Sequence, residues 1–121
     1  MSLLLNLLSV IASCTPSPAL EERKPEQIRA FISAINARDE AAVGNFLAPG
    51  ATYSNREVQG ISLPTVMTDL ISNPAAERLD IVAVTTQDDA VLLRTRTPSG
   101  SIAMAVVRLS GGCIRTFHQL R

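Results

Sequence analysis

Three polar side chains in the 121-residue chain have the chemistry for a reactive or ligand-binding site. His118 is the single histidine, and its imidazole would serve as a general base near neutral pH. Tyr53 is the single tyrosine, whose hydroxyl would orient a ligand, and Asn55 follows two residues later. Plainer interpretations stand beside these: an inert histidine at a sheet edge or dimer rim, and a packed tyrosine ring whose hydroxyl reaches the surface.

Charged residues offer a weaker signal for a binding site. Arg94 and Arg96 share one face of a predicted strand, where they would either hold an anionic ligand or form the charged rim of an exposed sheet end. Asp88 and Asp89 fit a turn, which lies far from any cleft. One histidine and two cysteines are too few for a zinc or iron–sulfur site, so we expect no metal and no cofactor.

The overall composition excludes one large class of partner. Eleven basic and eleven acidic residues balance to a net charge of zero, whereas a nucleic-acid-binding surface needs a basic face. Aromatic residues are only 3% of the chain, which also disfavours base stacking. The hydrophobic fraction of 46% predicts a folded domain rather than a disordered one.

The first twenty residues have the pattern of an export leader and tether. Ten of residues 1–14 are apolar, and no charge precedes Glu21. This run is too short to span a bilayer, and Ile11–Cys14 resembles a bacterial lipoprotein processing box. We therefore expect residues 1–20 to direct the chain to the periplasm or cell envelope, with Cys14 as a candidate for lipid attachment. A packed N-terminal helix, a cytoplasmic protein and a Cys14–Cys113 disulfide are the alternatives.

Residues 21–121 predict one α+β domain whose helices come first. A helix should begin near Pro25, because apolar residues follow it at helical spacing. A short second helix, capped by Asp39, should bury Val43, Phe46 and Leu47, and a strand should cover residues 51–55. Ser62 should cap a third helix whose inward residues are Val66, Met67, Leu70 and Ile71.

The rest of the chain predicts four strands in an antiparallel meander. The strand-like runs are 78–86, 90–97, 101–109 and 113–120, and breaks of about three residues with Gly or Asp separate them. In the third run, both alternating faces are largely apolar. One face should pack against the helices, and the other should pair with a second copy of the chain in a homodimer.

The stretch from Glu26 to Leu47, within the run Pro25–Asn55, resembles the NTF2-like superfamily in its SnoaL-like and ketosteroid isomerase branch. The likeness extends through the meander to Arg121. It implies a cone in which three helices pack on a strongly curved antiparallel sheet, with a pocket at the open end. The branch's carboxylate base would fall on Asn55, its helix tyrosine on Phe31 and its buried acid near Ala105, and none of these can replace the missing groups.

The resemblance implies a ligand-binding domain without the isomerase acid and base. We expect a small apolar or amphipathic ligand in the cone, with six pocket candidates: Phe31, Tyr53, Asn55, Met67, Ala105 and His118. Two alternatives stay open. One is an enzyme of the SnoaL-like type that uses Tyr53, Asn55 and His118. The other is a structural or partner-binding dimeric module.

Overall fold

A computed structural model describes residues 9–121 of the chain. The helices are α1 (Pro18–Glu21), α2 (Lys24–Asn36), α3 (Glu40–Gly44) and α4 (Leu63–Ser72). The strands are β1 (Leu47–Ser54), β2 (Ile61–Ser62), β3 (Asp80–Gln87), β4 (Ala90–Arg96), β5 (Ile102–Ser110) and β6 (Cys113–Gln119). Most of the apolar run predicted to be a leader, residues 1–8, lies outside the described residues.

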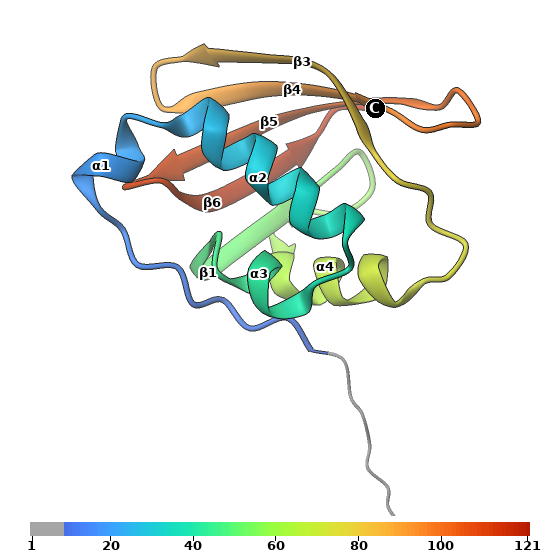
Figure 1. The fold of residues 1–121 in the computed structure, drawn as a ribbon, viewed down its shortest axis with the longest axis horizontal. Coiled ribbons are helices and arrows are strands. Elements are labelled where there is room, and N and C mark those ends of the chain that lie inside the picture. The colour runs from blue at the N-terminus through green and yellow to red at the C-terminus, as the bar shows by residue number, and fades with distance from the viewer. Residues whose placement is uncertain (1–8) are drawn as a thin grey trace, which may run out of the picture.

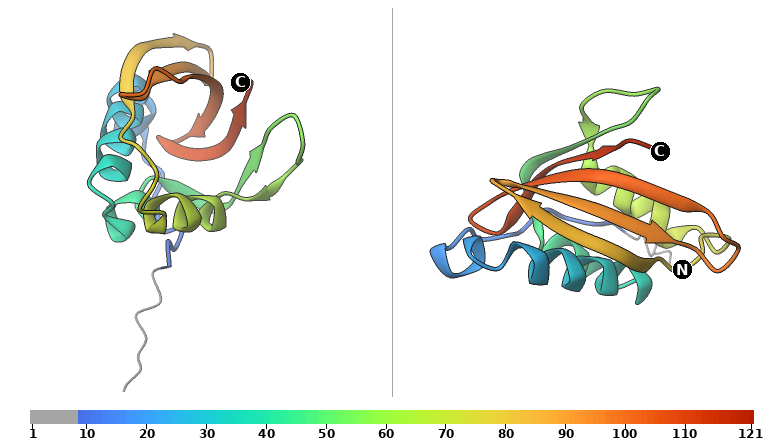
Figure 2. Two further views of the ribbon diagram at one scale, coloured as in Figure 1. Left: turned by 90° about the vertical axis from the view of Figure 1, so that its right-hand side faces the viewer. Right: turned by 90° about the horizontal axis from the view of Figure 1, so that it is seen from above.

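All six strands form one sheet in the order β2-β1-β6-β5-β4-β3. The predicted meander is confirmed, since β3, β4, β5 and β6 pair with their neighbours in antiparallel register. Strand β1 joins this meander in parallel with β6. Figure 2 shows the strands curling into an open arc, with α2 along one side and α4 below it, so the helices cover only the concave face.

Helix α2 is the main apolar surface that the sheet wraps (Figure 1). Pro25 and Glu26 suit its first turn, where backbone N–H groups lack helical partners and the dipole favours negative charge. Ile28, Phe31 and Ile35 are buried, as the spacing predicts. Because burying each such side chain contributes about 1.5–3 kcal/mol, this face fixes the helix against the sheet.

The helix caps at Asp39 and Ser62 are confirmed. The Asp39 carboxylate accepts a hydrogen bond from the backbone N–H of Ala42, and the Ser62 hydroxyl accepts one from Thr65. The predicted end of the second helix was wrong. Helix α3 stops at Gly44, and Leu47 already begins β1.

Strand β1 is longer than the predicted 51–55 because an irregular segment sits inside it. Its register with β6 shifts between Leu47 and Thr52. Pro49 has no N–H for the ladder, and Gly50 has a φ of 80°, a left-handed conformation that glycine adopts readily. The Pro-Gly pair, which indicated the end of a helix, is therefore a bulge within a strand.

The segment 9–20, here called the N-terminal strap, packs on the domain instead of forming a free tether. Val10 is buried, and the backbone N–H of Cys14 donates to the Leu47 carbonyl oxygen at 3.1 Å. The N–H of Ser17 donates to the Gly111 carbonyl oxygen at 3.0 Å. These contacts join most of the strap to the folded unit, whose start the sequence analysis expected at residue 21.

A disulfide between Cys14 and Cys113 fastens the strap to the start of β6. The two cysteines are 99 positions apart in the sequence, so the bond closes a loop of most of the chain. Loops of this size are worth about 4–5 kcal/mol of stability in the chain-entropy account. The pairing is the disulfide that the sequence analysis left open as an alternative to lipid attachment at Cys14. Within residues 9–121, no helix is long and apolar enough to cross a bilayer.

Candidate functional site

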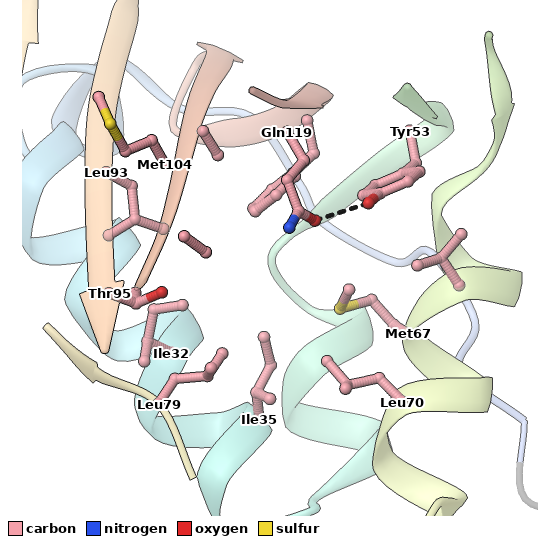
Figure 3. Close-up of a pocket in the computed structure, with 14 residues that line it drawn as sticks. Ile32, Ile35, Tyr53, Met67, Leu70, Leu79, Leu93, Thr95, Met104 and Gln119 are labelled. Atoms are coloured by element: carbon pink, nitrogen blue, oxygen red, sulfur yellow. Dashed lines mark hydrogen bonds between the residues drawn. The ribbon is translucent and has the colours of Figure 1, made fainter. Parts of the chain in front are cut away.

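A cavity of about 290 Å³ lies between the concave face of the sheet and helices α2 and α4. Figure 3 shows its walls, which are mainly aliphatic. The helices contribute Ile32, Ile35, Val66, Met67 and Leu70, and the segment before β3 contributes Leu79. Residues three or four apart on a helix share a face, so two short apolar stripes suffice to build this wall.

The sheet contributes residues of its central strands to the cavity, including the consecutive residues Ala103, Met104 and Ala105 of β5. Leu93 of β4 stands in register with Ala105 of β5, which stands opposite Gln119 of β6, and all three line the space. Two alanines, Ala103 and Ala105, occupy β5 at this level. Because their side chains are small, the sheet leaves room where larger residues would fill the centre of the cone.

Tyr53 and Gln119 form a fixed polar pair at one end of the cavity. The Tyr53 hydroxyl donates to Oε1 of Gln119 at 2.6 Å, as Figure 3 shows. The amide nitrogen of Gln119 donates to the carbonyl oxygen of Arg121 at 2.9 Å, which fixes the orientation of the amide. The Tyr53 ring stacks on Phe117 with centroids 5.9 Å apart. The side chains of Tyr53 and Gln119 are thus held in place in the absence of a ligand.

Thr95 supplies a second polar group from β4. The residue is only 5% exposed, and Figure 3 shows its hydroxyl directed into the cavity. Every fully buried side-chain N or O atom among residues 9–121 has a hydrogen-bond partner. No side-chain partner of the Thr95 hydroxyl is found among these residues, so that oxygen faces the open space of the cavity.

Three of the six predicted pocket residues line the cavity: Tyr53, Met67 and Ala105. Phe31 does not, because its fully buried ring turns to α3 and packs edge-to-face on Phe46 at 6.0 Å. Asn55 lies just past the end of β1, where its Oδ1 accepts hydrogen bonds from the N–H groups of Glu57 and Val58. Its amide reaches the Tyr53 hydroxyl at 3.4 Å without lining the cavity.

His118 lies on the outer face of the sheet. Its neighbours Phe117 and Gln119 line the cavity, so strand alternation turns the histidine away from it. It is exposed and stands in register with Val106 of β5 and Ser54 of β1. The structure therefore does not bring Tyr53, Asn55 and His118 together into one site.

The predicted arginine pair also faces outward. Arg94 and Arg96 are exposed, while the residues between and beside them in β4, Leu93 and Thr95, face the cavity. The turn at Asp88 and Asp89 is confirmed: Asp88 has a φ of 57°, and Asp89 accepts a salt bridge from Arg108 at 3.0 Å. None of these charges lies in the cavity wall.

Perturbed ionisable groups lie outside the cavity. The hydroxyl of Ser99 holds the pKa of the Glu77 carboxyl below its usual value, and a hydrogen bond to Asp80 raises the pKa of Arg78. Both residues border a smaller neighbouring cavity of about 120 Å³. Tyr53 is the only ionisable side chain in the described wall of the cavity between the sheet and helices α2 and α4. The site can orient a molecule through hydrogen bonds, but it holds no carboxylate or imidazole that would take a proton near neutral pH.

Sequence reasoning missed Thr95 and Gln119. The available signal was alternation: Thr95 continues the face of Val91 and Leu93, opposite the arginines. A threonine that continues an apolar strand face is a candidate for a hydroxyl inside the core. Gln119 gave no comparable signal, because its place in the cavity depends on the pairing of β6 with β5.

No protein-family model and no curated protein sequence matches the chain. Several solved protein structures, in contrast, align with the chain. A SnoaL-like protein of unknown function from Burkholderia thailandensis aligns with a TM-score of 0.66 at 17% identity, over 87% of this chain and 97% of that one. An NTF2-like protein of unknown function from Cytophaga hutchinsonii gives 0.66 at 17% identity, over 79% and 87%.

A third solved structure has the same architecture and is described by the broader term cystatin fold. A cystatin-fold protein from Novosphingobium aromaticivorans aligns with a TM-score of 0.65 at 18% identity, over 79% of this chain and 96% of that one. Identities this low establish fold and leave activity open. The chain therefore has the α+β cone of the NTF2-like and SnoaL-like proteins, as the sequence resemblance implies.

Proposed function

We propose that the chain binds a small, largely apolar molecule in the cavity between its sheet and helices. The observation that carries the proposal is the cavity of about 290 Å³, whose wall is apolar apart from the hydrogen-bonding groups of Tyr53, Thr95 and Gln119. Ligand pockets commonly have this character, with apolar surface for affinity and few polar groups for orientation.

Binding is favoured over acid–base catalysis by the chemistry of the wall. Asn55, the position of the branch's base, caps its own loop, and His118 faces the other side of the sheet. The remaining ionisable group, the Tyr53 phenol, is engaged as a donor to Gln119. A single tyrosine without a paired base is a poor general acid or base.

The direct test is saturable binding of a neutral fluorescent probe, N-phenyl-1-naphthylamine, to the full chain. We expect one site per chain and a rise in melting temperature with probe concentration. The variant Ala105→Phe fills the cavity and should weaken binding about tenfold or more. Val106→Phe, one residue away on the outer face, is the matched control.

Melting curves without probe separate loss of the cavity from loss of the fold. If Ala105→Phe does not fold, Ala105→Leu replaces it with a smaller increase in volume. Absence of saturable binding to the wild-type chain, or equal loss in both variants, would refute the proposal.

We also propose that the chain works in an oxidising compartment, the periplasm or cell envelope. The support is the Cys14–Cys113 disulfide, a bond that persists outside the reducing cytosol. The apolar residues near the start of the sequence agree with export.

Fractionation of expressing cells, with thiol alkylation before and after reduction, tests the proposal. We expect the chain in the envelope fraction, with both thiols reactive only after reduction. A cytoplasmic chain with two free thiols would contradict it. Fatty-acid labelling that disappears in Cys14→Ser would show that lipid takes the place of the disulfide.

A further inference from the structure

The cavity has two polar ends separated by an apolar middle. The Thr95 hydroxyl lies on β4, and the Tyr53–Gln119 pair lies on β1 and β6. Strands β4 and β6 are separated by β5, and Thr95 lies two residues along from the row of Leu93, Ala105 and Gln119, so the two ends are about 12 Å apart along the sheet. Leu93 and Ala105 cover the sheet between them. This arrangement selects a molecule with some length.

At the Gln119 end, the free hydrogen-bonding capacity is a donor. The Gln119 oxygen accepts from Tyr53, and one of its two amide N–H groups donates to the Arg121 carbonyl. The second N–H remains, and Figure 3 shows the amide nitrogen on the cavity side of the pair. A ligand acceptor such as a carbonyl oxygen satisfies it.

At the Thr95 end, the group is a hydroxyl that can donate or accept. The residue is 5% exposed, and its hydroxyl opens only to the cavity, so a ligand that fills the cavity displaces water from this group. A hydroxyl or carbonyl on the ligand would hydrogen-bond it, whereas an apolar group there would leave it without a partner. Between the ends, no described wall residue carries a formal charge, so an ionised ligand would lose its hydration without gaining a counter-ion.

We infer that the ligand is an elongated, uncharged molecule with a carbonyl-type acceptor at the Gln119 end and a hydroxyl-type group at the Thr95 end. This inference rests on the proposed binding function and adds the chemical class of the ligand. Thr95 and Gln119 are the residues that decide specificity. The apolar wall contributes affinity but does not discriminate between ligands with different hydrocarbon skeletons.

The test uses naphthalenes of similar shape that displace N-phenyl-1-naphthylamine from the full chain. 2-Isopropylnaphthalene carries no polar group, 2-acetylnaphthalene adds the carbonyl, and 6-acetyl-2-naphthol adds a hydroxyl at the far end. 2-Naphthoate replaces the ketone with a charge. We expect the carbonyl and the hydroxyl each to tighten binding about fivefold, and the carboxylate to bind at least about tenfold more weakly than the ketone.

Two nearly isosteric substitutions assign each gain to its residue. In Thr95→Val, the hydroxyl of 6-acetyl-2-naphthol should give no gain, while the isopropyl compound binds as it does to wild type. In Gln119→Leu, the advantage of the ketone over the isopropyl compound should disappear. Thr95→Val should melt close to the wild-type temperature without ligand, because it keeps the shape of the side chain and breaks no hydrogen bond to another described side chain.

The outcomes separate the inference from the function on which it rests. If the fluorescent probe does not bind, the proposed function is wrong. If the probe binds but the naphthalenes fail to displace it, or the polar and apolar compounds bind equally, the inference is wrong and the binding function stands. Naphthoate binding as tightly as the ketone overturns the uncharged class. Gains that survive both substitutions overturn the assignment to Thr95 and Gln119.

Discussion

Adjacent residues of β6 have opposite roles because the strand alternates. Phe117 and Gln119 line the cavity, and His118 between them is exposed on the outer face. We predict that His118→Ala changes the affinity for N-phenyl-1-naphthylamine by less than about twofold, whereas Phe117→Ala weakens it and lowers stability by about 2–4 kcal/mol. Fluorescence titration and urea unfolding measure the two effects. A tenfold loss of binding in His118→Ala would mean that the histidine reaches the ligand.

Glu21 gives the fold a pH dependence that can be assigned to one carboxylate. A hydrogen bond from Lys24, at 2.7 Å, holds the pKa of Glu21 below its ordinary value of 4.5, and the N–H of Gly111 adds to this effect. A lowered folded-state pKa means stability that is present above the unfolded value and lost as the pH falls through the folded one. Solvent reaches the group, so the effect is small.

We therefore predict that the melting temperature of the wild-type chain falls more steeply between about pH 5 and pH 3 than that of Glu21→Gln. Glu77, whose pKa Ser99 lowers, remains in the variant and keeps part of the slope. Thermal unfolding followed by circular dichroism gives both curves. Parallel curves would show that Glu21 contributes nothing in solution.

At the residue scale, periodicity predicted burial better than it predicted the site. Ile28, Phe31, Ile32 and Ile35 are all buried, as their spacing indicates. The rotation of α2 about its own axis, relative to α3 and the sheet, decides which of them lines the cavity. Phe31 packs on Phe46 from the segment after α3, while Ile32 reaches the cavity. This rotation is set by tertiary packing, so the spacing of apolar residues within one helix does not predict it.

Among the elements, the N-terminal strap depends on a close approach at Gly44. A Cβ at this position would overlap the carbonyl oxygen of Ile11. Gly44 ends α3, so alanine there would otherwise help the helix by up to about 1 kcal/mol. We predict that Gly44→Ala instead lowers stability and exposes the N–H of Ser13, which donates to the Gly44 carbonyl at 3.0 Å.

Hydrogen exchange at Ser13 and the melting temperature test the docking of the strap. Ala41→Gly, on an exposed position of the same helix, is the control, because it changes helix propensity without touching the strap. An increase in stability in Gly44→Ala, with the Ser13 amide still protected, would show that the strap does not lie against α3.

Local sequence signals predicted the elements joined by short turns and missed those that depend on distant partners. The meander follows from strand-like runs separated by tight breaks, and all four of its strands are confirmed. The parallel pairing of β1 with β6 joins segments more than sixty residues apart, and no local pattern indicates it. The strap is held by a disulfide and backbone hydrogen bonds, which leave no periodic trace in the sequence.

The whole molecule has one sheet face that its own helices do not cover (Figure 2). On that face, Leu92 and Ile102 are 40% and 45% exposed, and Arg94 and Arg108 flank them. We predict that two copies pair through this face, since a twofold axis would bury both apolar sets at once. The same symmetry brings like charges together, so salt should tighten the dimer by screening them.

Sedimentation equilibrium at low and high salt measures this association. Leu92→Glu should weaken the dimer at least about tenfold, because it places a charge in the buried patch. Ile61→Glu, at a similarly exposed position on the edge strand β2, should leave it unchanged. A chain that stays monomeric at all salt concentrations would contradict the predicted dimer. A dimer that weakens as salt rises would mean that opposite charges, rather than the apolar residues between the arginines, hold the two copies together.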